Sequence, residues 1–215
     1  MMVWSAYRCI YAEVKLEGAA YCINKGRWYS IDKDFVSAVE SDYKDIQVSG
    51  RVFLPYRKSH TKEAQYSVDF VASDPTNLLL MDAKTIQHGG GHSKIELGDV
   101  LTSDNTFIHI KRYSSSAALS HLFNQAVVST ELVISDPDFR GKANKKIKEQ
   151  SKKKQFQIKE SDTKSITVIL AILSDFQDEH PPIPFFSKIA IRYAQRRLQA
   201  FGCKVFIKNI TREQD

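Results

Sequence analysis

The sequence lacks the residue patterns of a secreted, disulfide-stabilised or membrane protein. Its 215 residues include three cysteines, Cys9, Cys22 and Cys203, an odd number with no Cys-x-x-Cys pair. A disulfide framework or a zinc site is therefore not expected, and a reducing cytosol fits this cysteine usage. The longest apolar run, residues 166–173, is well short of the roughly 18 residues that a membrane helix needs. No basic stretch followed by an apolar segment opens the chain, so we expect a cytoplasmic protein with no membrane partner.

Signatures of several enzyme classes are also missing. The chain contains no Gly-x-Ser-x-Gly, no His-Glu-x-x-His, no Rossmann fingerprint and no P-loop. These absences argue against the corresponding serine hydrolases, zinc proteases, dinucleotide-dependent enzymes and NTPases. The sequence also has no internal repeat and no linker rich in glycine, serine or proline. Its length suits one domain or little more.

Positive charge is concentrated in one segment. Residues 140–160 contain nine basic and two acidic residues, whereas the whole chain has a net charge of only +6. A local excess of this kind attracts polyphosphates through counterion release. A solvated lysine-rich loop would have the same composition, so both interpretations stay open. The candidate nucleic-acid contacts, in this segment and on the strand before it, are Arg112, Arg140, Lys142, Lys145, Lys146, Lys152, Lys153 and Lys154.

Alternating and helical apolar patterns predict a mixed α/β fold with 42% hydrophobic residues available for its core. For residues 1–50 we expect an N-terminal hairpin and helix packed on a core of residues 51–215. In this extension the expected elements are strands over 7–16, 20–24 and 27–31, then a helix capped by Asp32 or Asp34. In the core they are strands over 51–54, 77–81, 94–101, 106–111, 165–173 and 203–207, and helices over 61–72, from 114–116 and over 185–201. The last strand, helix and strand suggest a crossover unit with a parallel pair.

Charged residues lie near the ends of three predicted central strands. Asp82 ends the first, Glu96 and Asp99 lie on the second, and His109 and Lys111 lie two residues apart on the third. Residues two apart on a strand share a face, so we expect these last two side chains to lie on the same face of the sheet. Carboxylates hold Mg²⁺, which neutralises phosphate charge and activates water, and a lysine stabilises the developing negative charge. The pattern is typical of metal-dependent phosphodiesterases.

This block resembles the restriction-endonuclease-like nuclease superfamily, whose signature is Asp on one strand and Asp/Glu-x-Lys on the next. Asp99 matches the first acid, and His109-Ile110-Lys111 matches the second motif with histidine in place of the acid. Gln125 matches a functional glutamine found on the following helix in many members. The resemblance implies a restriction-endonuclease-like mixed central sheet flanked by helices. It also implies cleavage of DNA that depends on Mg²⁺ (or Mn²⁺).

A closer resemblance is to the C-terminal half of a sporadically distributed bacterial family of uncharacterised proteins. The matching run is an Ile95-Glu96-x-x-Asp99 strand, an Ile-His-x-Lys strand over residues 108–111, and Ser-x-x-Leu-Ser-His-Leu-Phe-x-Gln over residues 116–125. The stretch over residues 21–35 is similar to an upstream landmark of that family. Its members often lie on mobile or phage-defence islands. The resemblance therefore implies a role in anti-phage defence, with a larger partner such as a helicase.

Histidine at position 109 leaves three alternatives open, because it is a poorer ligand for hard cations than a carboxylate. Glu96 or Asp82 could complete the metal site, His109 could act as the general base, or the protein could bind nucleic acid without cleaving it. Asp82-Ala83-Lys84 is itself a second, weaker Asp-x-Lys candidate. The plainest interpretation is that the aspartates are turn residues at strand ends.

The sequence thus predicts a metal-dependent DNA nuclease with a restriction-endonuclease-like core. The predicted catalytic residues are Asp99, Lys111, Glu96, His109 and Gln125, and the predicted metal ligands are Asp99, Glu96 and Asp82. RNA remains open as a substrate, and a homodimer is compatible with cutting both strands. The rival prediction, from another class, is an inactive nucleic-acid-binding or adaptor subunit of a defence complex.

Overall fold

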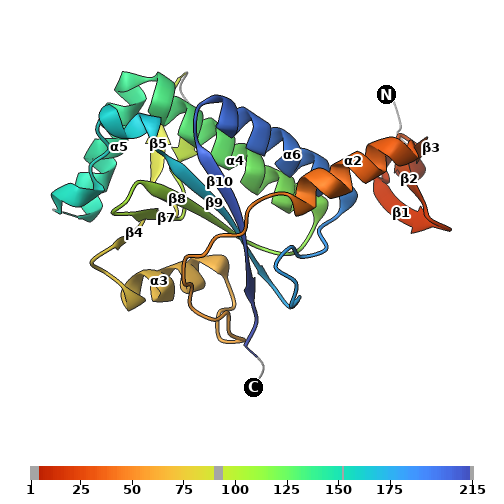
Figure 1. Ribbon diagram of the computed structural model, residues 1–215, viewed down its shortest axis with the longest axis horizontal. Coiled ribbons are helices and arrows are strands. Elements are labelled where there is room, and N and C mark those ends of the chain that lie inside the picture. The colour runs from red at the N-terminus through yellow and green to blue at the C-terminus, as the bar shows by residue number, and fades with distance from the viewer. Residues whose placement is uncertain (1–4, 90–93, 152, 214–215) are drawn as a thin grey trace.

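The computed structural model describes residues 5–89, 94–151 and 153–213 (Figure 1). Its N-terminal part is a three-stranded antiparallel sheet of order β1-β2-β3, followed by a helix. The elements are α1 (Ala6–Cys9), β1 (Ala12–Leu16), β2 (Ala19–Asn24), β3 (Arg27–Ile31) and α2 (Lys33–Lys44). This confirms the predicted hairpin and helix. The first predicted strand is too long at its start, because residues 6–9 are helical and the strand begins at Ala12.

Local sequence explains the tight connections in this part. Glu17-Gly18 and Lys25-Gly26 form two-residue hairpin turns, and all four residues have positive φ, as the right-handed strand twist demands of such turns. Asp32 caps α2, where its side chain accepts a hydrogen bond from the N–H of Phe35 at 3.0 Å.

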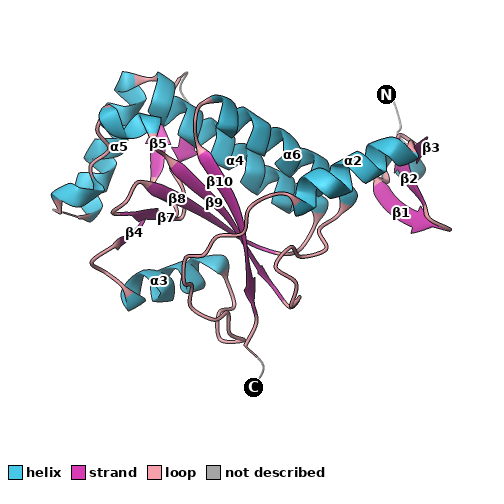
Figure 2. Ribbon diagram, in the orientation of Figure 1, coloured by secondary structure: helices cyan, strands magenta, loops and turns pink. Residues whose placement is uncertain are grey.

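The centre of the molecule is a five-stranded mixed sheet of order β10-β9-β8-β7-β4 (Figure 2). Its strands are β4 (Leu78–Leu80), β7 (Val100–Thr102), β8 (Thr106–Arg112), β9 (Thr167–Ser174) and β10 (Lys204–Thr211). The last three run parallel, and β7 runs antiparallel to both of its neighbours. Helix α6 (Phe185–Ala200) connects β9 to β10, which confirms the predicted crossover.

One predicted strand, residues 94–101, is wrong as a single element. Its first part is β6 (Lys94–Glu96), which pairs with β5 (Thr85–Gln87) in a separate two-stranded sheet, and its last part enters the central sheet as β7. The break falls at Gly98, which has φ +154°. An added Cβ there would lie 3.3 Å from the carbonyl oxygen of Ile108, so the chain passes closer to β8 than a side chain would comfortably allow.

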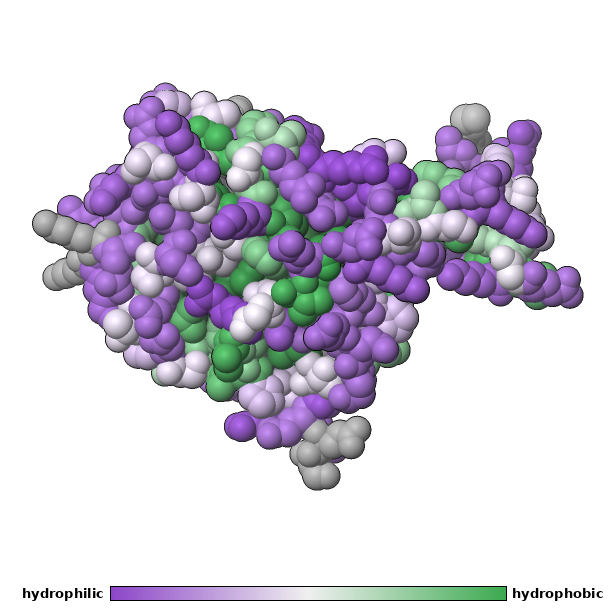
Figure 3. Space-filling view, viewed as in Figure 1, coloured by the Kyte–Doolittle hydropathy of each residue, from purple (hydrophilic) through white to green (hydrophobic). Residues whose placement is uncertain are grey.

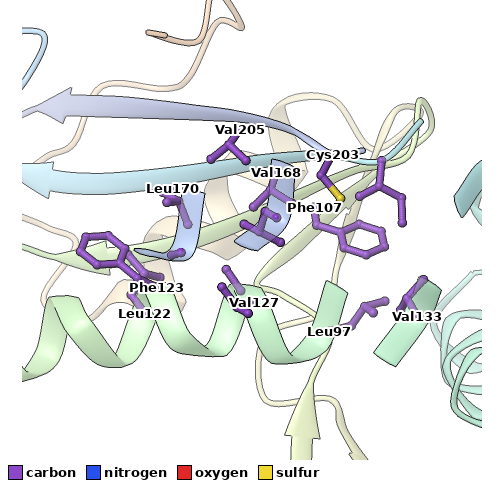
Figure 4. Close-up of a cluster of buried hydrophobic side chains, with 14 of the residues drawn as sticks. Leu97, Phe107, Leu122, Phe123, Val127, Val133, Val168, Leu170, Cys203 and Val205 are labelled. Atoms are coloured by element: carbon purple, nitrogen blue, oxygen red, sulfur yellow. The ribbon is translucent and has the colours of Figure 1, made fainter. Parts of the chain in front are cut away.

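Helices cover both faces of the central sheet. Helices α4 (Ser116–Ser135), α5 (Pro137–Gln150) and α6 lie on one side, and α3 (Glu63–Ser73) lies on the other (Figure 1). Successive residues of β8 alternate between the two resulting cores, with Phe107 in one and Ile108 in the other, as the strand period requires. Figure 4 shows the larger core, where Phe107 and Val168 from the sheet lie against side chains of α4.

The basic segment begins as a helix rather than a loop. Asp136 caps α5, and Phe139, Ala143 and Ile147 form a buried stripe at helical spacing. Two short 3₁₀ turns follow at Lys154–Phe156 and Ser161–Lys164. The short strand predicted over residues 51–54 does not form, and isolated bridges from Val48 to Ile207 and from Tyr56 to Arg212 tie this stretch to the edge strand instead.

Hydrogen bonds, ion pairs and ring contacts join the N-terminal part to the core. Tyr43 of α2 donates a hydrogen bond to the carbonyl oxygen of Pro181 at 2.7 Å. Glu13 of β1 accepts one from the N–H of Phe186 at 3.0 Å, in the first turn of α6. Within the described ranges, no helix is both long and apolar enough to span a bilayer.

Candidate active site

Asp99 lies where three strands of the central sheet meet. Its backbone N–H donates to the carbonyl oxygen of Ile108 at 2.9 Å, and its carbonyl oxygen accepts from the N–H groups of Met81 and Asp82 at 2.8 and 3.0 Å. Its carboxylate accepts a hydrogen bond from the N–H of Ile110 at 2.5 Å. The residue is therefore held by the end of β4, the start of β7 and the middle of β8.

Two carboxylates occupy the edge of β8 that β7 leaves uncovered. The pairing of β7 with β8 extends only from Phe107 to Ile108, so no strand in the described part of the chain pairs with the N–H groups of Ile110 and Arg112 on that edge. Asp99 accepts from the first of them, and Glu63 accepts from the second at 2.9 Å. Asp99, which precedes β7, and Glu63 of α3 thus bind successive outward-facing N–H groups of β8.

Glu63 also contacts the predicted catalytic lysine. Its Oε2 lies 2.8 Å from Nζ of Lys111, and each side chain is 31% exposed. Sequence reasoning did not single out Glu63, because it lies 48 residues before its partner and only the packing of α3 against the sheet brings the two together. The sequence around Glu63 indicates only that it lies in the first turn of a predicted helix. Glutamate is common at that position for reasons of helix stability, so the position does not indicate a functional site.

The charge environment of Asp99 is strongly negative. Burial raises the pKa of Asp99 to about 7, the hydrogen bond from Ile110 opposes this rise, and the charges of Asp82, Glu96 and Glu63 add to it. We call Glu63, Asp82, Glu96 and Asp99 the acidic cluster. It offers only oxygen ligands, and a divalent cation would relieve the repulsion among its members, so its chemistry fits a hard cation such as Mg²⁺.

Glu96 connects the acidic cluster to a groove at the surface. Its Oε2 accepts a hydrogen bond from Nε2 of Gln125 at 2.6 Å. Both side chains line a groove of about 330 Å³ between β6 and α4, together with His121 and Asn124. The structure therefore brings Glu96 and Gln125 together. Glu96 lies on β6 of the small two-stranded sheet, however, and not on the same strand as Asp99 as the sequence predicted.

His109 lies in the core and not at the surface of the site. It is fully buried, neither ring nitrogen has a hydrogen-bond partner among the residues that the structure describes, and an added Cβ on Gly98 would lie 3.5 Å from its Nε2. Burial lowers the pKa of His109 to about 4, so its ring is neutral near pH 7. Because β8 is unbroken over Thr106–Arg112, the side chains of His109 and Lys111 leave the same face of the strand, as predicted. They differ in burial, since His109 is enclosed in the core whereas Lys111 reaches Glu63 of α3. This geometry gives no support to His109 as the general base or a metal ligand.

The acidic cluster fits an open metal site better than a closed one. In the parts of the chain that the structure describes, no three His, Cys, Asp or Glu side chains converge closely enough to enclose an ion. Two members are already engaged, Glu63 with Lys111 and Glu96 with Gln125. Mg²⁺, however, is usually held by one or two carboxylates together with waters and substrate phosphates. Asp99 with one neighbour would suffice for that mode.

A family model described as a family of unknown function, DUF6119, matches residues 1–211. The chain belongs to this family. No curated protein and no solved structure matches it. The assignment agrees with the resemblance to an uncharacterised family, and it carries no activity of its own.

In this DUF6119 protein, the second candidate triplet is a tight turn after β4. Ala83 has φ +56°, and the N–H of Lys84 donates to the carbonyl oxygen of Met81 at 3.0 Å. The turn places Asp82 near enough to Asp99 for its charge to raise the pKa of that carboxyl. The role of Asp82 as an additional metal ligand stays a prediction.

Both arginines among the predicted nucleic-acid contacts have structural partners. Nε of Arg112 donates to the hydroxyl of Tyr56 at 2.6 Å, and its guanidinium lies 5.5 Å from the centre of that ring. Arg140 donates to the carbonyl oxygen of Val133 at 2.8 Å, near the end of α4. Both guanidiniums therefore help to hold the fold together.

The lysines of α5 line a second groove. Lys142, Lys145 and Lys146 border a groove of about 480 Å³ between α5 and β5. Lys142 reaches the carbonyl oxygen of Gln87 at 3.2 Å, and Lys146 pairs with Glu149 at 2.8 Å. Lys153 reaches the carbonyl oxygen of Pro75 at 2.9 Å, whereas Lys152 and the side chain of Lys154 lie outside the described residues.

This basic groove adjoins the acidic cluster through the small two-stranded sheet. Thr85, which borders the groove, pairs with Glu96 of the cluster. A polyanion along α5 would therefore approach the acidic cluster across the width of two strands, which are about 5 Å apart.

Proposed function

We propose that this DUF6119 protein is a divalent-metal-dependent nuclease that hydrolyses phosphodiester bonds in DNA. The observation that carries the proposal is the meeting of Asp99, Glu63 and Lys111 at the uncovered edge of β8. An acid before one strand and a lysine on the next is the arrangement to which the sequence resemblance points. The uncovered strand edge is where such groups can face a substrate.

The acidic cluster would hold the metal. Asp99, with Asp82 or Glu96, would bind Mg²⁺ or Mn²⁺, which supplies an activated water and neutralises phosphate charge when bound. Lys111 stabilises the negative charge that develops on the phosphate. Gln125 orients Glu96 through its hydrogen bond.

Glu63 takes the place of the acid that position 109 lacks. It reaches the end of β8 from α3 and fixes both Lys111 and the backbone of Arg112. His109 then serves the packing beneath the site rather than the chemistry. This division of roles accounts for a nuclease-like site with a histidine in the Asp/Glu-x-Lys position.

The basic groove supports nucleic acid as the substrate class. Its three lysines would neutralise phosphates and release counterions on binding. From the family resemblance we further propose a cytoplasmic, anti-phage role, with a larger protein such as a helicase as a partner. The engaged states of Glu63 and Glu96 favour one alternative, an inactive subunit that binds nucleic acid and cannot cut it.

A cleavage assay tests the proposal. Supercoiled DNA, linear DNA and RNA are incubated with the protein in Mg²⁺, Mn²⁺ or EDTA, and Asp99→Asn and Lys111→Met are compared with the controls Asp178→Asn and Lys204→Met. The controls change an exposed carboxylate and an exposed lysine outside the acidic cluster. We expect metal-dependent cleavage that falls by about 100-fold or more in both site variants and is unchanged in both controls.

Two outcomes would contradict the assignment. Cleavage that survives both site variants would place the active site elsewhere. Salt-sensitive binding without cleavage in either metal would favour the inactive subunit, because a binder keeps its affinity in EDTA.

A further inference from the structure

The N-terminal sheet projects from the body and concentrates exposed apolar side chains. It lies beyond the start of α2 and forms a narrow extension of the molecule in both ribbon and space-filling views (Figures 1 and 3). Among the described residues, eight of the twelve exposed large hydrophobic side chains fall between Tyr7 and Phe35. Apolar side chains gathered on one exposed element indicate an interaction surface.

Five aromatic and cationic residues lie in or beside the turn at one end of this sheet. The ring of Tyr7 and the side-chain stem of Arg8 lie against Gly26 in the β2–β3 turn, where an added Cβ would be 2.9 Å from the tyrosine ring and 3.5 Å from the arginine. Helix α1 therefore lies over this turn. We call the resulting group the aromatic tip: Tyr7, Arg8, Lys25, Arg27 and Trp28. Its two aromatic residues are 49% and 56% exposed.

The cations of the aromatic tip are unpaired. Arg8, Lys25 and Arg27 make no hydrogen bond or ion pair through their side chains with any residue in the described ranges. The other charged side chains of the sheet either have partners elsewhere or lie far from the aromatic tip. Glu13 caps α6, Lys15 pairs with Glu40 at 3.0 Å, and the remaining acid of the sheet lies in the β1–β2 turn at its opposite end.

We infer that the aromatic tip binds single-stranded nucleic acid, with its rings stacked on bases and its cations on phosphates. Aromatic side chains beside unpaired arginine and lysine are the usual elements of a single-strand platform, because every base has a face on which to stack. A duplex buries those faces and would gain only the phosphate contacts. The inference rests on the proposed function for the ligand class, and it adds a binding site separate from the acidic cluster.

The aliphatic side chains of the sheet do not alter this choice. Val14 and Leu16 are exposed on β1, but they pair with Tyr21 and Ala19 towards the β1–β2 turn, away from the aromatic tip. A protein partner would be expected to cover that end. The tip itself combines +3 of unpaired charge with two rings, which suits a polyanion that carries bases.

Fluorescence anisotropy in EDTA tests the inference without requiring cleavage. The full chain carrying Asp99→Asn is titrated into a labelled thymidine oligonucleotide of about 16 nucleotides, within the usual site size. Trp28→Ala is compared with Trp28→Phe, which keeps a stacking ring, and with Tyr193→Ala, which removes an aromatic residue 64% exposed on α6. Thermal melting verifies that each variant is folded.

We expect Trp28→Ala to weaken single-strand binding at least about fivefold, and Trp28→Phe and Tyr193→Ala to change it little. Arg27→Gln should lower the slope of log K against log salt by about 0.7. The inference is overturned if the parent does not bind the single strand, if Trp28→Ala binds it equally well, or if a duplex of the same length shows equal affinity and equal sensitivity to Trp28→Ala. Because no metal is present, these results are independent of whether the acidic cluster cleaves DNA.

Discussion

Asp99 is half-buried and His109 is fully buried, and for both side chains the loss of solvent favours the neutral form. The pKa of Asp99 rises to about 7, while the pKa of His109 falls to about 4. Their effects on stability therefore have opposite pH dependence. A group with a raised pKa loses its stabilising contribution as pH rises, whereas the histidine loses its contribution as pH falls.

The pH dependence of Asp99 can be measured in the metal-free protein. Between pH 4 and 7, the folded chain holds a proton that the unfolded chain releases, so the free energy of unfolding should fall as pH rises through this range. The loss should be on the order of a few kcal/mol. Asp99→Asn should remove most of it. Urea unfolding in EDTA across this range checks the expectation, and identical pH profiles for the two proteins would contradict it.

His109 should be replaceable by an apolar side chain. Both of its ring nitrogens are buried with no hydrogen-bond partner in the described ranges, so His109→Leu should raise the free energy of unfolding by about 1–3 kcal/mol. It should also remove the loss of stability expected between pH 6.5 and about 4. Cleavage should stay within a few-fold of the parent. A folded variant with no cleavage would show instead that the imidazole takes part in the chemistry.

At the scale of the elements, the break between β6 and β7 positions Asp99. Gly98→Ala should destabilise the fold by about 1–3 kcal/mol, because a φ of +154° strains any residue with a Cβ and that Cβ would lie 3.3 Å from the carbonyl oxygen of Ile108. Gly141→Ala provides the matched control, since nothing lies within 4 Å of its Cβ and it lies in a helix. That change should stabilise the protein by about 0.5–1 kcal/mol. Denaturant unfolding of the two variants should thus give effects of opposite sign, and effects of the same sign would refute the role given to Gly98.

The elements predicted best from sequence are the long helices and strands whose apolar residues repeat with a single helical or strand period. The pattern around α4, β9, α6 and β10 identified each of them, because apolar residues repeat at helical or strand spacing over many residues. The break at Gly98 was missed, since the apolar residues of Lys94–Leu101 fit one continuous strand. The sequence of α5 is also compatible with a solvated loop, because its many lysines obscure three buried residues that are four apart.

The site was predictable only where its members lie on neighbouring strands. Asp82, Glu96 and Asp99 come together because β4, the small sheet and β7 follow one another along the chain. Glu63 could not be found in this way, because its position depends on how α3 crosses the sheet. The burial of His109 was hidden for a related reason, since a strand pattern gives the face of a residue and not what covers it.

At the scale of the whole molecule, the two cationic surfaces lie at opposite ends of the long axis. Helix α5 forms one end and the N-terminal sheet the other (Figure 1). The first surface adjoins the acidic cluster through β5 and β6. A strand held at the aromatic tip would therefore need to cross the body of the molecule to reach the basic groove.

The basic groove should contribute to nucleic-acid binding through charge alone. Replacing Lys142 and Lys145 together by Gln should weaken duplex binding uniformly across sequences and lower the salt slope by about 1.8. The matched control is Lys44→Gln with Lys204→Gln, which removes the same charge outside the groove. Binding titrations at several salt concentrations provide the measurement, and equal slopes for the two double variants would contradict a role for the groove.

The most direct test of the central claim is a count of divalent ions bound by the acidic cluster. Mn²⁺ is titrated at pH 8, where Asp99 is ionised, and the free ion is followed by its electron paramagnetic resonance signal. The parent and the Asp178→Asn control should bind the ion alike, and Asp99→Asn should bind it at least about tenfold more weakly. A parent that takes up no ion, or an Asp99→Asn variant that binds it as the parent does, would contradict the claim that these carboxylates form a metal site.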